Sequence, residues 1–265
     1  MSGLQKIAVT GKGGVGKTTL TALLARIYAQ QGRSVIAIDA DPAGGLANAL
    51  GLPREVVEQL KPISEMEELI YERTGAKPGS YGGFFNLTPR VDDIPDQYSV
   101  VYDDIRLLKL GTIDVGGSGC MCPESALLKA LVTHLLLYRD EVMIMDMEAG
   151  VEHLGRATTQ AVDAMLIVVE PGRRSLEVAG RIRELASDLK LQRLYAVGNK
   201  VRSAADRDFI AAHSPVPIVG YLSASVEVID ADLRGAPVYE VAPQVVEEAQ
   251  VVLAAIEAKV QESAS

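Results

Sequence analysis

The sequence predicts an α/β protein built around a mostly parallel, doubly wound β-sheet. Short apolar runs alternate along the chain with segments of helical periodicity, which is typical of parallel strands joined by covering helices. A glycine-rich, lysine-containing loop separates the first apolar run from the first helical segment, as in folds that bind phosphate at a helix N-terminus. With 265 residues, 48% of them apolar and 23% charged, the chain can bury a large core, so we expect a single domain over residues 1–265.

Six short apolar runs predict the strands of this sheet. Most of them are followed by a segment of amphipathic pattern, so we expect helices on both faces. In chain order the runs are KIAVT at 6–10, SVIAID at 34–39, EVMIMD at 141–146, AMLIVVE at 164–170, LYAVGN at 194–199 and PIVGYL at 217–222.

Residues 52–112 interrupt the alternation, and we interpret them as an insertion. The stretch contains glycine- and proline-rich pieces. Its last part, within YSVVYDDIRLLKLGTI, predicts a hairpin that turns at Asp103-Asp104.

The last segment of the chain predicts a helix with one face on the core and an acidic outer face. Its apolar residues recur at steps of three and four, which is the period of a helix with one buried side. They are Val245, Ala249, Val252, Leu253, Ile256 and Val260.

The charge balance and the hydropathy exclude several classes of partner. Lys and Arg number 26 against 35 Asp and Glu, a formal net charge of −9, so we expect no nucleic-acid partner. No apolar run reaches the roughly 18 residues of a membrane span, and the first residues lack the pattern of a signal peptide. We therefore expect a cytoplasmic protein without a membrane partner.

The stretch GKGGVGKTT, at 11–19, has the spacing G-x-x-x-x-G-K-[ST] between a predicted strand and a predicted helix. Its glycines let successive N–H groups turn toward phosphate oxygens, Lys17 neutralises the β and γ phosphates, and the Thr18 hydroxyl can ligate Mg²⁺. A plain glycine turn is the alternative, but it needs neither the lysine nor the hydroxyl. The predicted nucleotide contacts are Gly13, Gly14, Val15, Gly16, Lys17, Thr18 and Thr19.

A second lysine, Lys12, lies inside this loop, where phosphate binding alone does not need one. With it, the pattern K-G-G-x-G-K-[ST]-[ST] resembles the deviant Walker loop of the dimeric ATPases that include MinD, ParA and the nitrogenase iron protein. The resemblance implies a P-loop NTPase fold, ATP hydrolysis with Mg²⁺, and a homodimer in which Lys12 reaches the partner's phosphates. The catalytic residues that it implies are Lys12, Lys17 and Asp41.

Two predicted strand ends match the same class of ATPase. In IDADPAG, the resemblance implies that Asp41 orients the attacking water. It also implies that Asp39 contacts the ligands of the magnesium ion rather than the ion itself. In IMDMEAG, it implies that Asp146 faces the magnesium ion through water and that the Gly150 N–H senses the γ-phosphate, both as parts of a switch. Taken alone, an acidic residue after a strand is often a helix cap.

Asn199, at the end of LYAVGN, resembles the asparagine that reads adenine in these ATPases, because its amide can both donate and accept a hydrogen bond. An asparagine in a turn after a strand is also common for local reasons. The segment 220–238 resembles the last crossover of the family, whose loop lines the base.

Both cysteines of the chain, Cys120 and Cys122, lie in GGSGCMCPE, one residue apart and just before a predicted helix start at Pro123. A C-x-C pair offers two thiolates, whereas zinc and nickel sulfur sites use four ligands. Two copies of the segment on a two-fold axis would complete such a site. A buried, inert pair is the alternative.

The chain over nearly its whole length resembles the CooC-type maturation ATPases, which are nickel-insertion accessory proteins of carbon monoxide dehydrogenase. The shared stretches include PISEMEELI, GGFF, VDDIPDQYSV, GGSGCMCPE and DMEAGVEHLGR. The resemblance implies an ATP-hydrolysing, dimeric metallochaperone that holds Ni²⁺ or Zn²⁺ between the cysteine pairs of two chains. It also implies a carbon monoxide dehydrogenase or acetyl-CoA synthase precursor as the client.

Two other functions stay open at this point. A ParA- or MinD-like switch would use ATP only to occupy DNA or membrane, but the last helix carries four glutamates against one lysine, which disfavours both surfaces. An iron–sulfur electron-transfer ATPase, like the nitrogenase iron protein, uses two cysteines far apart in sequence rather than a C-x-C pair.

Overall fold

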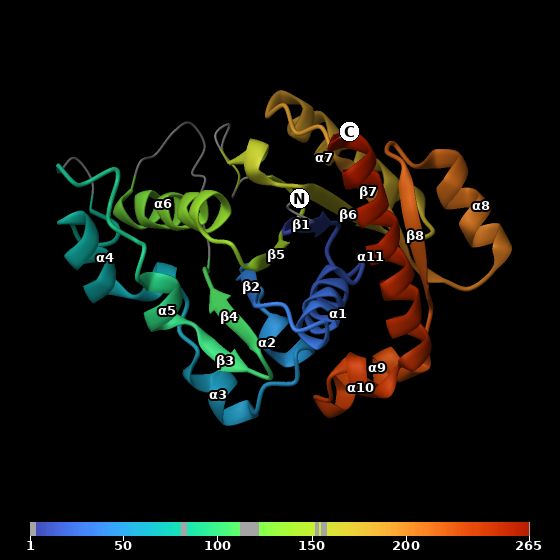
Figure 1. Cartoon of the computed structure of the whole chain (residues 1–265), viewed down its shortest axis with the longest axis horizontal. Coiled ribbons are helices and arrows are strands. Elements are labelled where there is room, and N and C mark those ends of the chain that lie inside the picture. The colour runs from blue at the N-terminus through green and yellow to red at the C-terminus, as the bar shows by residue number, and fades with distance from the viewer. Residues whose placement is uncertain (1–3, 81–83, 112–121, 152–153, 155–157, 265) are drawn as a thin grey trace.

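The computed structural model describes residues 4–80, 84–111, 122–151, 154 and 158–264. Within these ranges the chain forms one eight-stranded sheet with helices on both faces (Figure 1). The strands are β1 (Lys6–Gly11), β2 (Val35–Ala40), β3 (Val100–Tyr102), β4 (Ile105–Lys109), β5 (Val142–Met147), β6 (Ala164–Val169), β7 (Leu194–Val201) and β8 (Ile218–Ser223). The helices are α1 (Lys17–Gln30), α2 (Leu46–Ala49), α3 (Arg54–Gln59), α4 (Glu67–Thr74), α5 (Ile94–Tyr98), α6 (Pro123–Tyr138), α7 (Arg173–Asp188), α8 (Ala204–His213), α9 (Val226–Arg234), α10 (Val238–Val241) and α11 (Pro243–Ala264), with 3-10 turns at Ile63–Glu65 and Thr159–Ala161.

The strand order is β3-β4-β2-β5-β1-β6-β7-β8, and every neighbouring pair is parallel except the β3–β4 hairpin. The chain leaves β1 toward one edge of the sheet and later crosses past β1 to build the other edge. This reversal opens a crevice at the carboxyl ends of the central strands, which is where open α/β sheets bind ligands. The predicted fold class and all six predicted strands are confirmed.

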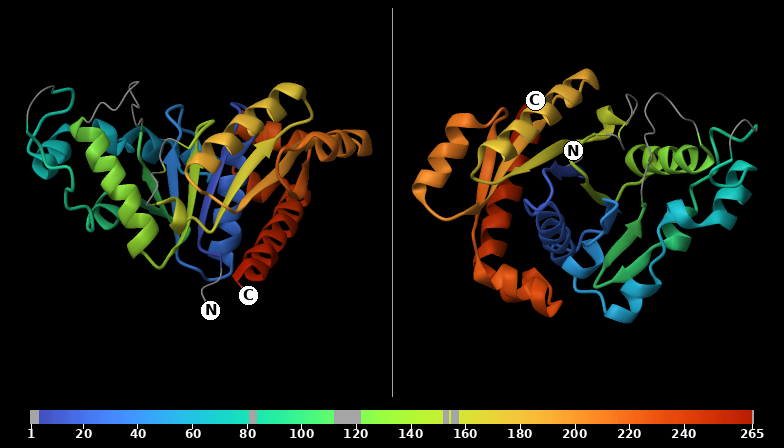
Figure 2. Two further views of the ribbon diagram at one scale, coloured as in Figure 1. Left: turned by 90° about the horizontal axis from the view of Figure 1, so that it is seen from above. Right: turned by 180° about the vertical axis from the view of Figure 1, so that it is seen from behind.

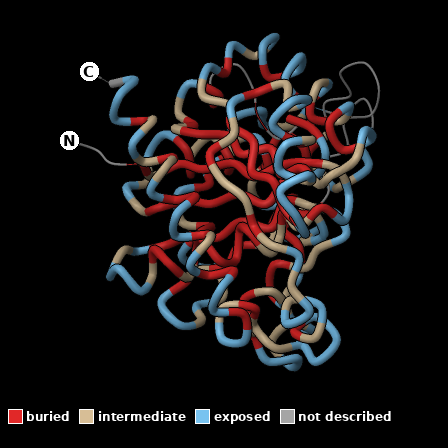
Figure 3. Tube along the Cα trace, turned by 90° about the vertical axis from the view of Figure 1, so that its right-hand side faces the viewer, coloured by how far each residue is buried: buried red, intermediate tan, exposed pale blue. Residues whose placement is uncertain are grey.

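Two apolar layers flank the sheet, because successive strand residues point to opposite faces. On β1, Ile7 and Val9 belong to the layer that contains α1 and α11, whereas Ala8 between them belongs to the layer that contains α6 and α7. Figure 2 shows these helices on the two sides of the sheet, and Figure 3 shows that the buried positions concentrate in the interior of the molecule. The strands read as continuous apolar runs because both faces are covered.

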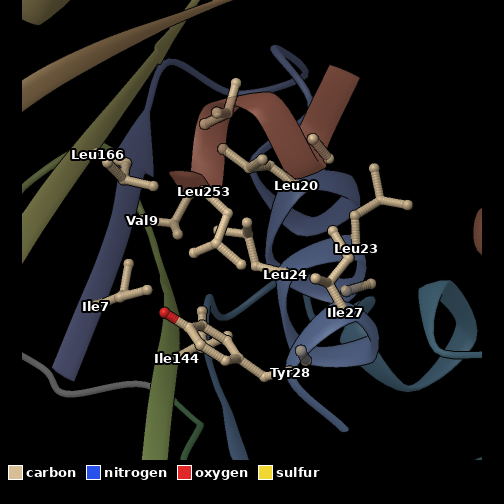
Figure 4. Close-up of a cluster of buried hydrophobic side chains, with 14 of the residues drawn as sticks. Ile7, Val9, Leu20, Leu23, Leu24, Ile27, Tyr28, Ile144, Leu166 and Leu253 are labelled. Carbon is tan, nitrogen blue, oxygen red and sulfur yellow. The ribbon is translucent and has the colours of Figure 1, made fainter. Parts of the chain in front are cut away.

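The packing of α1 on β1 holds the start of that helix, and therefore the loop before it, against the middle of the sheet. Leu20, Leu24 and Tyr28 lie one above another along the buried side of α1 (Figure 4). The Tyr28 hydroxyl donates a hydrogen bond to Glu257 Oε1 of α11 at 3.2 Å. Burial of the phenol, together with the Glu257 carboxylate, raises the pKa of Tyr28.

The predicted hairpin is confirmed and forms one edge of the sheet. β3 and β4 pair antiparallel, and Asp103 and Asp104 between them have positive φ angles of 46° and 63°, as a tight two-residue turn requires. The Arg26 guanidinium of α1 binds the carboxylate of Asp103. Because β4 pairs parallel to β2, part of the segment 52–112 continues the central sheet.

The two predicted helix features are also confirmed. All six residues predicted for the inner face of the last helix are buried in α11, and α6 begins at Pro123. Among the described residues, no helix is long and apolar enough to cross a membrane.

Candidate active site

Where β1 leads into α1, a positive φ angle coincides with a close contact at Gly11 and Gly16, so both positions require glycine. The φ angle is 146° at Gly11 and 98° at Gly16, which is strained for residues with a Cβ atom. A Cβ atom at Gly11 would collide with the Val168 carbonyl oxygen, and one at Gly16 would collide with the Asn199 side chain. Of the predicted contact residues, 13–16 therefore form a tight turn, and 17–19 are the first residues of α1.

Asn199 lies against this loop from the end of β7. Its Nδ2 donates to the Val15 carbonyl oxygen at 2.7 Å, and its Oδ1 accepts from the Lys200 backbone N–H at 2.8 Å. One N–H and one lone pair of the amide remain for other partners. Asn199 thus supports the glycine-rich loop at 11–19, which is called the P-loop from here on. Its contact with adenine stays a prediction.

Lys17 and Asp41 meet at the carboxyl edge of the sheet. Lys17 Nζ lies 3.4 Å from Asp41 Oδ2, and only 6% of the Lys17 side chain is exposed. Asp41 Oδ1 accepts from the Ala43 backbone N–H at 3.0 Å. A phosphate in the loop would compete with Asp41 for the ammonium group and release one Asp41 oxygen next to the phosphate.

Asp39 is buried beneath the turn that carries Asp41. Its Oδ2 accepts from the backbone N–H groups of Gly45 and Leu46 at 3.1 and 3.2 Å, and its Oδ1 accepts from Asp41 N at 3.4 Å. Burial raises the pKa of Asp39, and these backbone hydrogen bonds oppose the rise. The carboxylate therefore fixes the position of the turn, while its predicted support of Mg²⁺ stays a prediction.

Two of the predicted magnesium residues, Thr18 and Asp146, are in direct contact. The Thr18 hydroxyl donates to Asp146 Oδ2 at 2.5 Å, whereas Asp146 Oδ1 is buried without a hydrogen-bond partner. Burial raises the pKa of Asp146 to about 7, and the hydrogen bond from Thr18 opposes this rise. A Mg²⁺ ion fits these residues, because it prefers oxygen ligands and its charge would offset the burial of the carboxylate.

The predicted switch residue Gly150 is hydrogen-bonded to Thr10 of β1, the strand that precedes the P-loop. The buried Thr10 hydroxyl donates to the Glu148 carbonyl oxygen at 2.6 Å and accepts from the Gly150 N–H at 3.3 Å. The same N–H lies 2.7 Å from the Glu148 carbonyl oxygen. Gly150 must therefore change its hydrogen bonds before its N–H can contact a γ-phosphate.

Lys12 pairs with a different carboxylate from Lys17. Its Nζ forms a 3.1 Å salt bridge with Glu170 Oε1, just after β6, and 37% of the Lys12 side chain is exposed. Glu170 Oε2 lies 3.5 Å from Lys200 Nζ. In the single chain, Lys12 is therefore paired with a carboxylate of the same chain.

A cavity of about 1040 Å³ lies beside the P-loop and is large enough for a nucleotide. Lys17 and Thr18 line one side of it, and residues of the segment 222–238 line the other. Apolar side chains in that segment, such as the half-buried Val228 and the exposed Ile229, offer a surface on which a base can pack. The predicted crossover thus borders the cavity beside the P-loop, and its contacts with a base stay predictions.

Of the two cysteines in the motif, the described residues include Cys122. Cys122 is half-buried at the residue before α6, with its Sγ 3.0 Å from Ser125 Oγ. Cys120 lies outside the described residues, so the predicted metal pair stays a prediction. Over the ranges that the structure describes, no group of three or more His, Cys, Asp and Glu side chains could hold a metal ion.

Three residues of the site were missed by sequence reasoning: Thr10, Glu170 and Lys200. Glu170 directly follows a buried strand, and Asp39 and Asp146 each lie one residue before the end of one, so this signal could have drawn attention to Glu170. Thr10 and Lys200 each adjoin a recognised residue, but their contacts reach segments far away in the sequence.

Comparisons with known proteins agree with this geometry. Residues 6–238 match the family model described as the CobQ/CobB/MinD/ParA nucleotide binding domain. The carbon monoxide dehydrogenase accessory protein CooC of Rhodospirillum rubrum is 45% identical over 252 residues, which is 95% of each chain. An uncharacterized ATP-binding protein of Methanocaldococcus jannaschii is 46% identical over 88% of this chain and 90% of its own.

Solved structures of lower identity share the fold. A ParA family ATPase from Chlorobium tepidum has a TM-score of 0.67 at 18% identity, covering 95% of this chain and 99% of that one. A putative plasmid partition protein from Borrelia burgdorferi, bound to AMPPNP, has a TM-score of 0.68 at 14% identity and covers 96% and 99%.

Proposed function

The chain belongs to the CobQ/CobB/MinD/ParA family of nucleotide-binding proteins and is a CooC-type ATPase, and from this we propose that it acts in metal delivery. In the proposed function, a homodimer uses ATP hydrolysis to insert Ni²⁺ into a carbon monoxide dehydrogenase or acetyl-CoA synthase precursor. The observation that carries the proposal is the 45% identity to a carbon monoxide dehydrogenase accessory protein over 95% of both chains.

In the proposed reaction, the P-loop and α1 bind the triphosphate through backbone N–H groups and Lys17. When bound, Mg²⁺ would supply positive charge at the phosphates, with the Thr18 hydroxyl as a ligand and Asp146 holding the ion through water. Lys17 turns from Asp41 to the phosphates, so that Asp41 can accept a hydrogen bond from water and orient it for in-line attack. Asp39 keeps Asp41 in place through the backbone of the turn.

In the proposed dimer, Lys12 leaves Glu170 and adds its charge to the partner's phosphates. The 3.1 Å contact with Glu170 is partly exposed, and salt bridges of that kind are weak enough to exchange. ATP would thus favour dimerisation, because its γ-phosphate supplies a stronger anionic partner for Lys12 than a single carboxylate does.

The metal cargo is proposed to bind between Cys120 and Cys122 of both subunits. Two thiolates per chain make four in a symmetric dimer, which suits tetrahedral Zn²⁺ or planar Ni²⁺. The half-buried Cys122 precedes α6, and the positive end of that helix favours a negatively charged sulfur atom.

Equilibrium dialysis of the nucleotide-bound protein against Ni²⁺ and against Zn²⁺ tests the cargo site. We expect one metal ion per two chains, with sulfur-to-metal charge-transfer absorption for nickel. Cys120→Ser and Cys122→Ser should each abolish tight binding, because either change removes two of the four sulfur ligands of the dimer. Metal uptake should also weaken as the pH falls, since thiols must lose their protons to bind.

His213→Ala is the matched control for adventitious nickel binding, because His213 is exposed at the end of α8 and its Nδ1 contacts the Phe209 carbonyl oxygen. This variant should keep the wild-type stoichiometry. One metal ion per chain, or tight nickel binding in both cysteine variants, would contradict the proposed site. A brown iron–sulfur absorption after anaerobic purification would favour electron transfer instead.

Client activation tests the delivery step separately. Nickel-loaded protein and ATP should restore activity to a nickel-free carbon monoxide dehydrogenase, whereas the Lys17→Ala variant should not. Equal activation without ATP would contradict the role of hydrolysis.

A further inference from the structure

Lys200 has a backbone conformation that lysine rarely adopts. Its φ angle is 57°, in the left-handed region, which is strained for a residue with a Cβ atom. The chain takes three steps on β7 from Gly198 to Val201 while β8 takes two, so Lys200 lies in a bulge. Such a conformation persists only when the surroundings hold it, and it is common near functional sites.

The bulge directs the Lys200 side chain to the P-loop. Lys200 Nζ donates to the Gly14 carbonyl oxygen at 2.6 Å and lies 3.5 Å from Glu170 Oε2. Its neighbour Asn199 donates to the Val15 carbonyl oxygen at 2.7 Å. Two consecutive carbonyl groups of the P-loop are therefore held by two consecutive residues of β7.

These two contacts determine which way the P-loop N–H groups point. In a trans peptide unit the C=O and N–H bonds point in opposite directions. The Gly14 carbonyl shares its unit with the Val15 N–H, and the Val15 carbonyl shares its unit with the Gly16 N–H. Holding both oxygens from the β7 side turns these N–H groups toward the opposite side, and Val15 N indeed points across the loop to the Lys12 carbonyl oxygen at 3.4 Å.

We propose that Lys200 is a positioning residue for nucleotide binding, whose ammonium group fixes the P-loop peptide units that receive the phosphates. It acts through the Gly14 carbonyl oxygen, beside the cavity that Lys200 helps to line. The strained backbone at Lys200 is retained because it brings the ammonium group to that oxygen.

Binding of Mg-ADP and thermal unfolding of Lys200→Gly and Lys200→Met test the proposal. Glycine removes both the ammonium group and the backbone strain, whereas methionine removes the ammonium group and keeps the strain. Both variants should raise the Kd for Mg-ADP by about tenfold, as expected for the loss of one charge-assisted hydrogen bond. The Tm of Lys200→Gly should nonetheless equal or exceed that of the wild type, so affinity and stability change independently.

Lys190→Gly is the matched control, because Lys190 also has a left-handed φ angle, 61°, and lies after α7 with its backbone N–H bonded to Ser187. This variant should keep the wild-type Kd. The proposal is overturned if Lys200→Gly binds Mg-ADP within twofold of the wild type, or if its loss of affinity comes with a lower Tm. It is also overturned if Lys200→Met retains normal affinity, since the backbone rather than the ammonium group would then be responsible.

Discussion

Replacing Asp146 by Asn should make the stability of the free protein less dependent on pH. Asp146 is fully buried at the end of β5, and burial raises its pKa to about 7 from an ordinary value of 3.8. Asparagine has the shape of the protonated acid and can still accept the hydrogen bond from Thr18 through its oxygen. The substitution therefore removes the charge of Asp146 and keeps that contact.

The sign and size of the effect follow from the two pKa values. Between pH 3.8 and 7 the unfolded chain loses this proton while the folded chain keeps it, so the wild type loses stability as the pH rises. Above pH 7 both states are ionised and the full cost of about 4 kcal/mol is present, since one pKa unit corresponds to about 1.4 kcal/mol. From pH 5 to pH 8, the stability of Asp146→Asn relative to the wild type should increase by about 2–3 kcal/mol.

Urea unfolding at several pH values, in EDTA and without nucleotide, measures this difference. Asp208→Asn is the matched control for the loss of one carboxylate, because Asp208 is exposed on α8. A constant difference between Asp146→Asn and the wild type from pH 5 to pH 8 would refute the reasoning, whatever its absolute size. As a second readout, Mg-ADP binding at pH 6 should release a proton in the wild type and not in the variant, because the metal ion requires the ionised carboxylate.

Two further predictions concern the reaction and the dimer. Lys17→Ala and Asp41→Asn should each lower kcat at least tenfold in a phosphate-release assay, because one removes charge at the phosphates and the other misplaces the water; near-normal turnover in either variant would contradict the mechanism. With a non-hydrolysable ATP analogue, Lys12→Ala should weaken dimerisation, while Glu170→Gln should strengthen it about two- to fivefold by releasing Lys12 from its own chain. Sedimentation velocity measures both, and an unchanged association constant in Lys12→Ala would count against contact with the partner's nucleotide.

Local pattern in the sequence was sufficient to predict most of the fold. Strands buried on both faces appear as short apolar runs, and the turn at Asp103-Asp104 and the helix start at Pro123 depend only on neighbouring residues. The sequence did not reveal that the hairpin continues the central sheet. Strand order depends on which strands pair in the folded chain, and here β4 pairs with β2.

The sequence alone also predicted most residues of the candidate site. The spacing of the P-loop predicts Lys17 and Thr18 as phosphate and magnesium residues, since this loop forms its own turn before a helix. Parallel strands end at one edge of the sheet, so Asp41 and Asp146 could be expected near them.

Only the tertiary structure decided which partner each remaining group has. Lys12 is bound by Glu170, Gly150 is tied to Thr10, and Lys200 holds Gly14, each across more than a hundred residues of chain. These contacts depend on the neighbouring positions of β1, β5, β6 and β7 in the folded sheet, and no local periodicity encodes that order. The sequence therefore determined which chemical groups the candidate site contains, whereas the packing of strands distant in sequence decided how those groups are held.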